Sequence, residues 1–291
     1  MGSTPVTVVL TDGLGNQMFQ YAAARAFAEQ RGVPLLIDAE SGFRWNIHGR
    51  GYELDAFRLT AALGKSNAGR VVHGVIRHVE DAAMRVGRYH LPPLHAWAGR
   101  YAANVTGFFQ SPAYFEKAAA LIRQEFQPRN SPPAGHVAMA EDGHGKETVG
   151  IHIRLQHAFS ATGEKVTPGL SGPAYEVPIA AYYRSAVEHI QRNVADPQWI
   201  VVTDTQPFDP ASIGITGPVS IQYPDPNVPA VWDQWLLSQC KHVVIGRSTF
   251  SWWAAWLRGP IRGISCAPRI FRPGGGFAQA TGIYPPEWQV L

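Results

Sequence analysis

The stretch VTVVLTDGLGNQMFQYAAARAFAEQRGVPLLI, residues 6–37, decides the fold of the first part of the chain. Its first six residues form an apolar run that predicts a buried strand, and Gly13 and Gly15 predict a tight turn directly after it. Small and aromatic residues then recur along one helical face over about 16–30, and a second apolar run follows at 33–37. Strand, helix and strand at this spacing are typical of a parallel crossover unit.

A second block of alternating elements begins at residue 148. Its apolar patterns predict strands over 149–154, 199–203 and 242–246, and helices over 179–193, 231–240 and 249–257. Two such blocks predict an α/β protein with two Rossmann-like domains facing a cleft. Ligands of such sheets bind beyond the carboxyl ends of the strands.

The segment between the two blocks has few large apolar residues. Residues 128–147 are rich in Pro, Gly, Asn, Ser and charged side chains, which favours a loop or linker. We therefore expect an N-terminal domain over 1–130, a linker or loop over 131–147 and a C-terminal domain over 148–291. A helix is predicted over 113–126, whereas the mixture of basic and apolar residues over 69–89 predicts no particular element.

The composition is that of a globular protein. The chain has 291 residues, 45% hydrophobic and 16% charged, so it can bury a core. A net charge of +3 without runs of Lys or Arg argues against a nucleic-acid binder but suits a phosphate pocket. The only cysteines, Cys240 and Cys266, do not support a disulfide framework and are expected to be buried thiols. Because neither a signal peptide nor a spanning apolar run is found, we expect a cytoplasmic protein, or one peripheral at the inner membrane.

The turn after the first strand is the first candidate site. In DGLGNQ, residues 12–17, the glycines allow a ligand to approach the backbone closely, and the helix N-terminus offers N–H groups to an anion. A dinucleotide fingerprint would need a third glycine where Met18 stands, so an NAD site is weakly supported. An ordinary tight turn is the alternative interpretation.

The second candidate site is GIHIR, residues 150–154. Side chains alternate along a strand, so His152 and Arg154 share one face while the isoleucines pack on the other. Arg154 can bind a diphosphate through paired N–H donors, and His152 can hydrogen-bond a base or a phosphate. A surface pair on an edge strand is the alternative.

Polar residues also follow two other predicted strands. Arg247, Ser248 and Thr249 stand where a strand passes into a helix, so the hydroxyl groups can cap the helix while its amides point at a phosphate. The tryptophans that follow are expected in the core. Asp204 can orient a helix, bind a sugar or ribose hydroxyl, or begin a turn.

The sequence offers no pattern for metal or serine-hydrolase chemistry. No His, Cys, Asp and Glu residues recur at metal-ligand spacing, and no GxSxG elbow occurs. We therefore expect no metal and no cofactor, with the charge of any diphosphate neutralised by arginines and helix N-termini.

Five segments together resemble family 11 of the glycosyltransferases, the α-1,2-fucosyltransferases. In the family's order they are GLGNQMFQYA at 13–22, GFFQSPAYF at 107–115, GIHIR at 150–154, VPIAAYY at 177–183 and SQCKHVVIGRSTFSWWAAWL at 238–257. The resemblance implies a two-domain transferase of the GT-B kind that inverts the anomeric carbon and is independent of metal. Its N-terminal domain would lie on the acceptor side, and its C-terminal domain would bind the GDP-sugar.

The resemblance also implies roles for individual residues. Arg154 would hold the β-phosphate of the leaving GDP, while His152 and Asp233 would contact guanine. Ser248 and Thr249 would contact the diphosphate, and Gly15 and Asn16 would close the donor site from the first domain. The full donor-binding set comprises Gly13, Gly15, Asn16, Gln17, His152, Arg154, Asp204, Asp233, Arg247, Ser248, Thr249 and Phe250.

The chain departs from the family pattern at three places near the expected sugar. Leu155, Gln156 and His157 replace an expected Arg-Gly-Asp continuation, Asp204 stands without its acidic neighbour, and Arg247 replaces an asparagine. His157 is a candidate general base beside Arg154 as the other catalytic candidate, because imidazole titrates near neutral pH. A mobile loop residue, or a reaction without a strong base, is the alternative.

The expected activity is transfer of L-fucose from GDP-fucose to the 2-hydroxyl of a terminal galactoside in an oligosaccharide or polysaccharide. The partners would be the GDP-sugar and a glycan acceptor, with no nucleic acid. A different GDP-6-deoxyhexose donor is one alternative. A catalytically silent glycan- or nucleotide-binding protein is another, motivated by the missing acidic residues.

Overall fold

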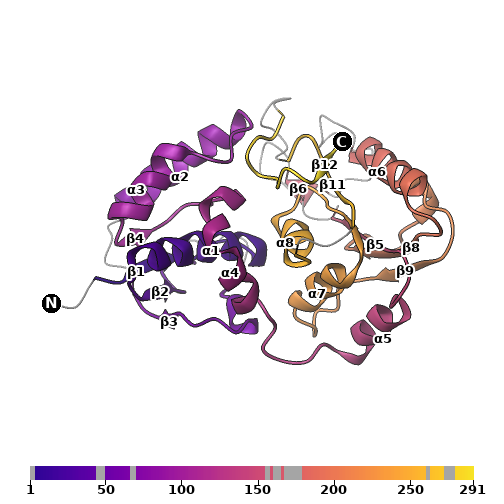
Figure 1. Cartoon of the computed structure of the whole chain (residues 1–291), viewed down its shortest axis with the longest axis horizontal. Helices are drawn as coiled ribbons and strands as arrows, with labels where there is room; N and C mark the ends of the chain where they lie inside the picture. The colour runs from indigo at the N-terminus through magenta and orange to yellow at the C-terminus, as the bar shows by residue number, and fades with distance from the viewer. Residues whose placement is uncertain are drawn as a thin grey trace. The chain divides into compact units, whose positions relative to one another are not determined.

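The computed structural model describes residues 4–43, 50–65, 70–154, 158–159, 165–166, 179–259, 263–271 and 279–291. The chain divides into two compact units (Figure 1). Unit 1 comprises Met1–Asn130 and Phe277–Pro285, and unit 2 comprises Ser131–Gly276 and Pro286–Leu291. Each unit is built on its own parallel sheet, which confirms the expectation of two Rossmann-like α/β folds.

Unit 1 contains a four-stranded parallel sheet in the order β3-β2-β1-β4. Its strands are β1 (Val6–Val9), β2 (Leu35–Asp38), β3 (Ala62–Leu63) and β4 (Asn104–Val105). Its helices are α1 (Leu14–Arg31), α2 (Arg70–Arg85), α3 (Pro92–Tyr101) and α4 (Ala119–Glu125), with 3-10 turns η1 (Leu54–Ala56), η2 (Pro112–Tyr114) and η3 (Glu116–Ala118). β1, α1 and β2 form the crossover unit predicted from residues 6–37.

Helix α1 carries much of the core of unit 1. Phe19 and Phe27 are buried on it, and Phe27 meets the ring of Phe109 edge-on with centroids 6.0 Å apart. The helix ends at Gly32, whose φ of 62° lies in the left-handed region that glycine adopts without strain. Because α1 follows β1 directly along the chain, its N-terminal end lies at the carboxyl edge of the sheet.

Unit 2 contains a six-stranded parallel sheet in the order β12-β11-β10-β5-β8-β9. Its strands are β5 (Thr148–Ile153), β8 (Gln198–Thr203), β9 (Val219–Gln222), β10 (His242–Val244), β11 (Ser265–Ala267) and β12 (Gln289–Val290), and a separate antiparallel pair is formed by β6 (Ala158–Phe159) and β7 (Lys165–Val166). Its helices are α5 (Ala134–Asp142), α6 (Ile179–Asn193), α7 (Val231–Gln239) and α8 (Thr249–Leu257), with the 3-10 turn η4 (Pro210–Ile213).

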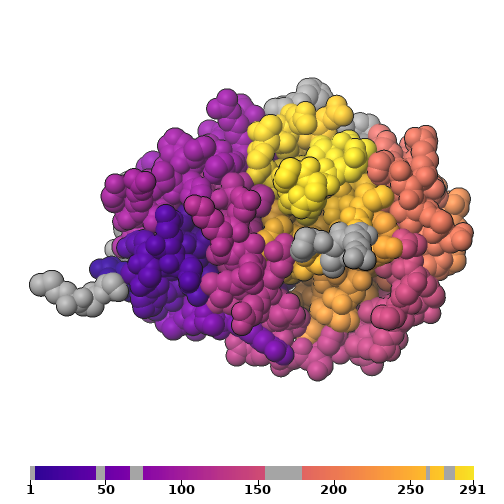
Figure 2. Space-filling view, viewed as in Figure 1, coloured from indigo at the N-terminus to yellow at the C-terminus, as the bar shows by residue number. Residues whose placement is uncertain are grey.

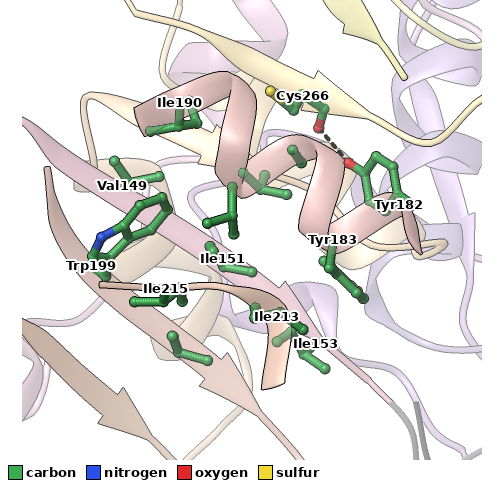
Figure 3. Packing of buried hydrophobic residues seen from close by; sticks show 14 of the residues in the cluster. Val149, Ile151, Ile153, Tyr182, Tyr183, Ile190, Trp199, Ile213, Ile215 and Cys266 are labelled. Carbon is green, nitrogen blue, oxygen red and sulfur yellow. Dashed lines mark hydrogen bonds between the residues drawn. The ribbon is translucent and has the colours of Figure 1, made fainter. Parts of the chain in front are cut away.

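The two faces of this sheet are covered by different helices. On one face, Ile151 and Ile153 of β5 and Trp199 of β8 pack with α6 and η4 in one buried cluster (Figure 3). On the other, Val202 of β8 packs with residues of α7 and α8. Neighbouring residues of β8 therefore face opposite layers, as the period of a strand requires.

The tryptophans of α8 and the two cysteines are buried in unit 2, as the sequence predicts. Trp252, Trp253 and Trp256 of α8 are buried, and the ring of Trp288 lies 5.5 Å from that of Trp252. The two cysteines, Cys240 and Cys266, are buried free thiols. Both expectations from the sequence are confirmed.

The structure differs from three expectations about segments of the chain. Helix α5 occupies most of 131–147, where a linker or loop was expected, because it packs against α7 within unit 2. Of the helix expected over 113–126, only α4 is α-helical, since Phe115 between η2 and η3 leaves helical geometry at a φ of −135°. The segment Phe277–Pro285, expected in the C-terminal domain, belongs to unit 1.

Residues 69–89, for which the sequence predicts no particular element, contain helix α2. Its pattern is unusual because valines face outward while Glu80 and Met84 face inward. Among the described residues, no helix combines the length and apolar character that crossing a bilayer requires.

Candidate functional site

The carboxyl ends of β5, β8 and β10 meet at one edge of the sheet of unit 2. β5 lies between the other two strands and is parallel to both, so the residues that follow the three strands are neighbours. The predicted residues placed at this edge are His152, Arg154, Asp204, Arg247, Ser248, Thr249 and Phe250. Segments far apart in the sequence therefore form one polar surface.

The imidazole of His152 is buried at this edge, on the side of the sheet that α8 covers. Its ring lies 5.1 Å from that of Phe250 between centroids. Burial, helped by the positive charge of Arg154 and partly opposed by Asp204, lowers the pKa of His152 to about 3, so the ring is neutral at physiological pH. Among the described residues, its Nδ1 atom has no hydrogen-bond partner. Buried polar atoms without a partner are uncommon in folded proteins.

Gly246 allows β5 and the loop after β10 to approach closely. A Cβ atom at this position would lie 2.7 Å from the hydroxyl of Tyr183 and 3.0 Å from the carbonyl oxygen of His152. The same hydroxyl donates a hydrogen bond of 2.8 Å to that carbonyl oxygen. Only glycine fits without displacing this contact. Gly246 was not among the residues predicted for the site, although it stands two residues before the serine predicted to cap a helix.

Ser248 caps helix α8 as predicted. Its Oγ atom accepts a hydrogen bond of 3.3 Å from the N–H of Phe250. The hydroxyl of Ser251 accepts from the N–H of Gly246 and donates to the carbonyl oxygen of Ser248, each at 3.2 Å, so the turn is tied to the helix. The positive end of the dipole of α8 therefore lies at the same edge as His152, in an arrangement that suits an anion.

The end of β8 contributes a second buried polar atom. The N–H of Thr205 donates to Oγ1 of Thr203 at 3.2 Å, which forms the turn after the strand. The Oγ1 atom of Thr205 has no partner among the described residues. Asp204 between them is half-buried and acts on the pKa of His152, so its carboxylate is in electrostatic range of that ring.

Asp233 lies in the first turn of α7 and pairs with a histidine that the sequence analysis did not select. Its Oδ1 atom lies 2.9 Å from Nε2 of His136 on α5, and both side chains are buried. Burial raises the pKa of the Asp233 carboxyl, while hydrogen bonds from His136 and Gln222 lower it. A pair separated by 97 residues along the chain leaves no local signal in the sequence.

The remaining predicted groups of unit 2 differ in exposure. Arg154 is exposed at the end of β5, and Arg247 is half-buried before the cap of α8. Thr249 begins α8. His157, the candidate base, lies outside the described residues, as do Leu155 and Gln156.

In unit 1, the predicted turn follows β1 and leads into α1. Gly13 is the N-cap of α1, and its carbonyl oxygen accepts from the N–H groups of Asn16 and Gln17 at 2.9 and 3.1 Å. Gly15 is buried in the first turn. The Oδ1 atom of Asn16 accepts from the amide of Gln110 at 2.8 Å, which ties the turn to the segment after β4.

Gln17 has a structural role in unit 1. Its side chain is buried, its Nε2 atom donates to the carbonyl oxygens of Asp12 and Gly51 at 2.8 Å each, and its Oε1 atom accepts from the N–H of Glu53 at 3.0 Å. Gln20 similarly accepts from the N–H of Thr11 at 2.9 Å. The side-chain amide of Gln17 therefore positions loops of unit 1, and its contact with a donor stays a prediction.

A cluster of charged residues that the sequence analysis missed lies at the carboxyl edge of unit 1. Asp12 adopts a φ of 66°, an uncommon value for aspartate, and its carboxylate lies 3.4 Å from Arg77 of α2. The guanidinium of Arg77 lies 5.0 Å from the ring centroid of Phe108. Buried Glu80 accepts hydrogen bonds from the N–H groups of Phe108 and Phe109 at 2.6 and 3.1 Å.

The pKa of Glu80 is higher than that of an ordinary surface carboxylate. Burial raises this pKa to about 7, although the two backbone N–H groups and the charge of Arg77 oppose the shift. Gly107, with a φ of 144°, keeps the backbone close to the carboxylate. Within the described part of the chain, no three His, Cys, Asp or Glu side chains are grouped so that they could hold a metal ion.

A comparison with protein families agrees with the polar edge described for unit 2. Residues 100–291 match the family described as Glycosyl transferase family 11. The chain belongs to this family. The match covers the whole polar edge of unit 2 and makes the protein a glycosyltransferase, as the sequence motifs implied.

Two curated relatives cover nearly the whole chain. An α-1,2-colitosyltransferase of Escherichia coli is 24% identical over 277 residues, 90% of this chain and 91% of the relative. The O-antigen biosynthesis glycosyltransferase WbnK, also of Escherichia coli, is 24% identical and covers 94% of this chain and 96% of its own length. An α-1,2 linkage is consistent with the first of these names.

Solved structures show the same fold at low sequence identity. The fucosyltransferase NodZ from Bradyrhizobium matches with a TM-score of 0.58 and 17% identity over 94% of this chain and 97% of that one. The NodZ α-1,6-fucosyltransferase soaked with GDP-fucose matches with a TM-score of 0.53 and 16% identity over 88% and 93% of the two chains. The family 11 chain thus has the GT-B fold that the sequence predicted, with two Rossmann-like units.

Proposed function

We propose that this family 11 protein is an inverting, metal-independent transferase that moves L-fucose from GDP-fucose to the 2-hydroxyl of a terminal galactoside. The observation that carries the proposal is the polar edge of unit 2. There, a neutral buried His152, an exposed Arg154 and the N-terminus of α8 follow two adjacent parallel strands. Together they offer hydrogen bonds and positive charge to a nucleoside diphosphate.

The diphosphate is assigned to Arg154 and the first turn of α8. Paired N–H donors of a guanidinium match phosphate oxygens, and the amides after Ser248 add the positive end of the helix dipole. Arg247, next to the cap, adds a second cation that the family pattern lacks. These groups take the charge that develops on the departing GDP, a role that a divalent metal plays in other transferases.

Guanine is assigned to His152 and Asp233. The imidazole of His152, which stays neutral, can hydrogen-bond the base. Asp233 is held by His136, and a carboxylate so fixed matches the neighbouring N–H donors of guanine. A pyrimidine lacks this donor pair, so the arrangement favours a guanine nucleotide.

In the proposed reaction, the acceptor's 2-hydroxyl oxygen attacks the anomeric carbon of fucose. The bond from that carbon to the β-phosphate oxygen breaks, and GDP leaves with the bonding electron pair. The hydroxyl proton passes to a base or to water, and the anomeric configuration inverts. Arg154 acts on the leaving group, and His157 stays a candidate for the proton acceptor.

A second donor is favoured by one comparison. The relative that is 24% identical over 90% of this chain is named as a colitosyltransferase, and colitose differs from L-fucose by the absence of the 3-hydroxyl. The residues at 155–157 and Arg247, where the chain departs from the family pattern, are the positions at which this choice would be made. GDP-colitose is therefore the alternative donor.

Calorimetric titration in EDTA separates these possibilities. GDP-fucose should bind, and GDP-mannose and UDP-galactose should bind at least tenfold more weakly. Tighter binding of GDP-colitose than of GDP-fucose would assign the second donor. Donor binding without transfer to any galactoside, and without slow hydrolysis of the donor, would identify a silent binding protein. Absence of guanine nucleotide binding would overturn the proposal.

A further inference from the structure

Exposed apolar side chains are concentrated in one short part of unit 1. The described residues contain seven large apolar side chains that are exposed, and five of them fall within residues 75–101. These five are Val75, Val79, Val86, Trp97 and Tyr101, with exposed fractions of 58, 53, 63, 40 and 72%. Isolated exposed apolar residues are ordinary, but such a concentration marks a contact surface.

On α2, the exposed valines lie along one stripe of the helix. Val75 and Val79 are four residues apart, and Val86 follows just beyond the end of the helix, three turns from Val75. Met84 and Glu80 are buried on the opposite side, and Glu80 is held by backbone N–H groups after β4. The valines therefore cannot turn inward without breaking these contacts.

On α3, the exposed aromatic residues form a second stripe. Trp97 and Tyr101 are four residues apart, while the neighbouring Ala98 and Gly99 are buried. A Cβ atom at Gly99 would lie 3.1 Å from Gln30 of α1, so α3 is packed closely on α1. Atoms of this part of unit 1 are exposed in the view of Figure 2.

The charge of the same segment is strongly one-sided. Residues 70–101 contain five arginines and two acidic residues, a net charge of +3 that equals the net charge of the whole chain. Arg85, Arg88 and Arg100 are exposed next to the apolar stripes, and Arg85 pairs with Asp81 at 3.0 Å. The rest of the chain is therefore electrically balanced, and the excess positive charge accompanies the exposed apolar residues.

We propose that α2 and α3 form a docking surface for an anionic phospholipid bilayer. This α2–α3 surface consists of Val75, Val79, Val86, Trp97 and Tyr101 with Arg85, Arg88 and Arg100. The valines lie at the boundary between headgroups and acyl chains, where amphipathic helices bind in the plane of the membrane. Trp97 and Tyr101 place a polar edge in the headgroups and an apolar ring below them. The arginines contact lipid phosphates with their stems along the apolar layer.

A bilayer explains this combination better than a protein partner does. The positive charge surrounds the apolar residues without an equivalent acidic patch for self-association, since residues 70–101 hold only Glu80 and Asp81 as acids. Glu80 is buried and Asp81 is paired with Arg85. A second copy would thus bring arginine against arginine, whereas anionic headgroups neutralise them.

Sedimentation with phospholipid vesicles tests the proposal on the full chain without any nucleotide sugar. We expect binding to phosphatidylcholine vesicles that contain phosphatidylglycerol, and at least tenfold weaker binding to phosphatidylcholine alone. The double variant Arg85→Gln, Arg100→Gln should bind more weakly by roughly fivefold per arginine, and added salt should weaken binding of the unmodified chain similarly.

Apolar variants test the other half of the surface. One double variant combines Val75→Ser with Val79→Ser, and a second combines Trp97→Ser with Tyr101→Ser. Each should lose at least tenfold in vesicle affinity, with unchanged circular dichroism and thermal unfolding. Val219→Ser and Arg192→Gln are matched controls, because both residues are exposed in unit 2, and they should bind vesicles normally.

Three results would overturn the proposal. The first is absence of binding to anionic vesicles at low salt, and the second is a loss of binding in the control variants equal to that in the surface variants. The third is a concentration-dependent dimer that the double variant Trp97→Ser, Tyr101→Ser abolishes, in a protein that does not bind vesicles. The last result would assign the surface to a second copy of the chain. Because no donor is present, none of these results bears on the proposed transfer.

Discussion

The hydroxyl of Tyr183 donates a 2.8 Å hydrogen bond to the carbonyl oxygen of His152, and Gly246 leaves the space in which this bond forms. Three elements meet at this contact: α6, the end of β5 and the loop after β10. The orientation of His152 at the polar edge therefore depends on a residue that has no side chain.

Substitution of Gly246→Ala tests this dependence. The added Cβ would stand 2.7 Å from the Tyr183 hydroxyl and 3.0 Å from the carbonyl oxygen of His152, so the backbone must shift. We expect a loss of about 2 kcal/mol in the free energy of unfolding and a clear loss of GDP affinity. Urea unfolding and calorimetry measure the two effects. Gly135→Ala is the control, because its Cβ would meet nothing within 4 Å, and normal GDP affinity in both variants would contradict the argument.

Arg154→Ala should remove activity while leaving the fold intact. The side chain is exposed, so little packing is lost, but the group that we propose to hold the departing GDP is removed. Loss of one such contact lowers kcat by roughly 10²–10³. Transfer assays at saturating donor measure it, with circular dichroism as the folding check. Arg192→Ala, an exposed arginine paired with Glu188 on α6, should retain full activity. Equal rates for the two variants would remove Arg154 from the site.

His152 should remain uncharged through the physiological pH range. Burial lowers its pKa to about 3, far below the ordinary value near 6.5. In an NMR titration from pH 8 to pH 5, its ring resonances should not move. Comparison with a His152→Gln variant identifies the resonance. A midpoint near pH 6.5 for His152 would show that the ring is accessible to water.

The pair formed by His136 and Asp233 should separate stability from nucleotide recognition. His136→Ala leaves a buried carboxyl without its 2.9 Å partner and should cost about 3 kcal/mol in the free energy of unfolding. Asp233→Asn keeps a hydrogen-bond acceptor and should cost less, yet it should weaken GDP binding by at least tenfold. Urea unfolding and calorimetry again measure the two. If Asp233→Asn binds GDP normally, the pair serves only to attach α5 to α7.

Local patterns explain which parts could be predicted. The alternation of His152 and Arg154 with isoleucines is visible in five consecutive residues, and the structure places the isoleucines in the core and His152 beside α8. The cap at Ser248 is equally local. The partnership of His136 with Asp233 spans 97 residues, and no pattern within either helix requires it. Because this contact is not visible locally, the sequence predicts a linker where α5 lies.

Helix α2 shows a different obstacle. An amphipathic pattern is normally interpreted with the apolar face inward. In α2, Val75 and Val79 face outward while Glu80 is buried, because backbone N–H groups after β4 compensate its burial. The charged cluster of Asp12, Arg77 and Glu80 depends on this inversion and could not be found before the fold was known.

Glu80 should make the stability of the protein depend on pH in the neutral range. Its pKa is raised from 4.5 to about 7 because burial outweighs the two N–H donors. The folded state thus binds a proton more tightly than the unfolded state does. The resulting stabilisation is fully present below pH 4.5 and is lost as the pH rises through about 7. For a shift of this size the loss is about 3 kcal/mol. Urea unfolding at pH 5 and pH 8 measures it, and Glu80→Gln should flatten the profile because the amide does not titrate. A variant that keeps the slope of the unmodified protein would show that another group titrates instead.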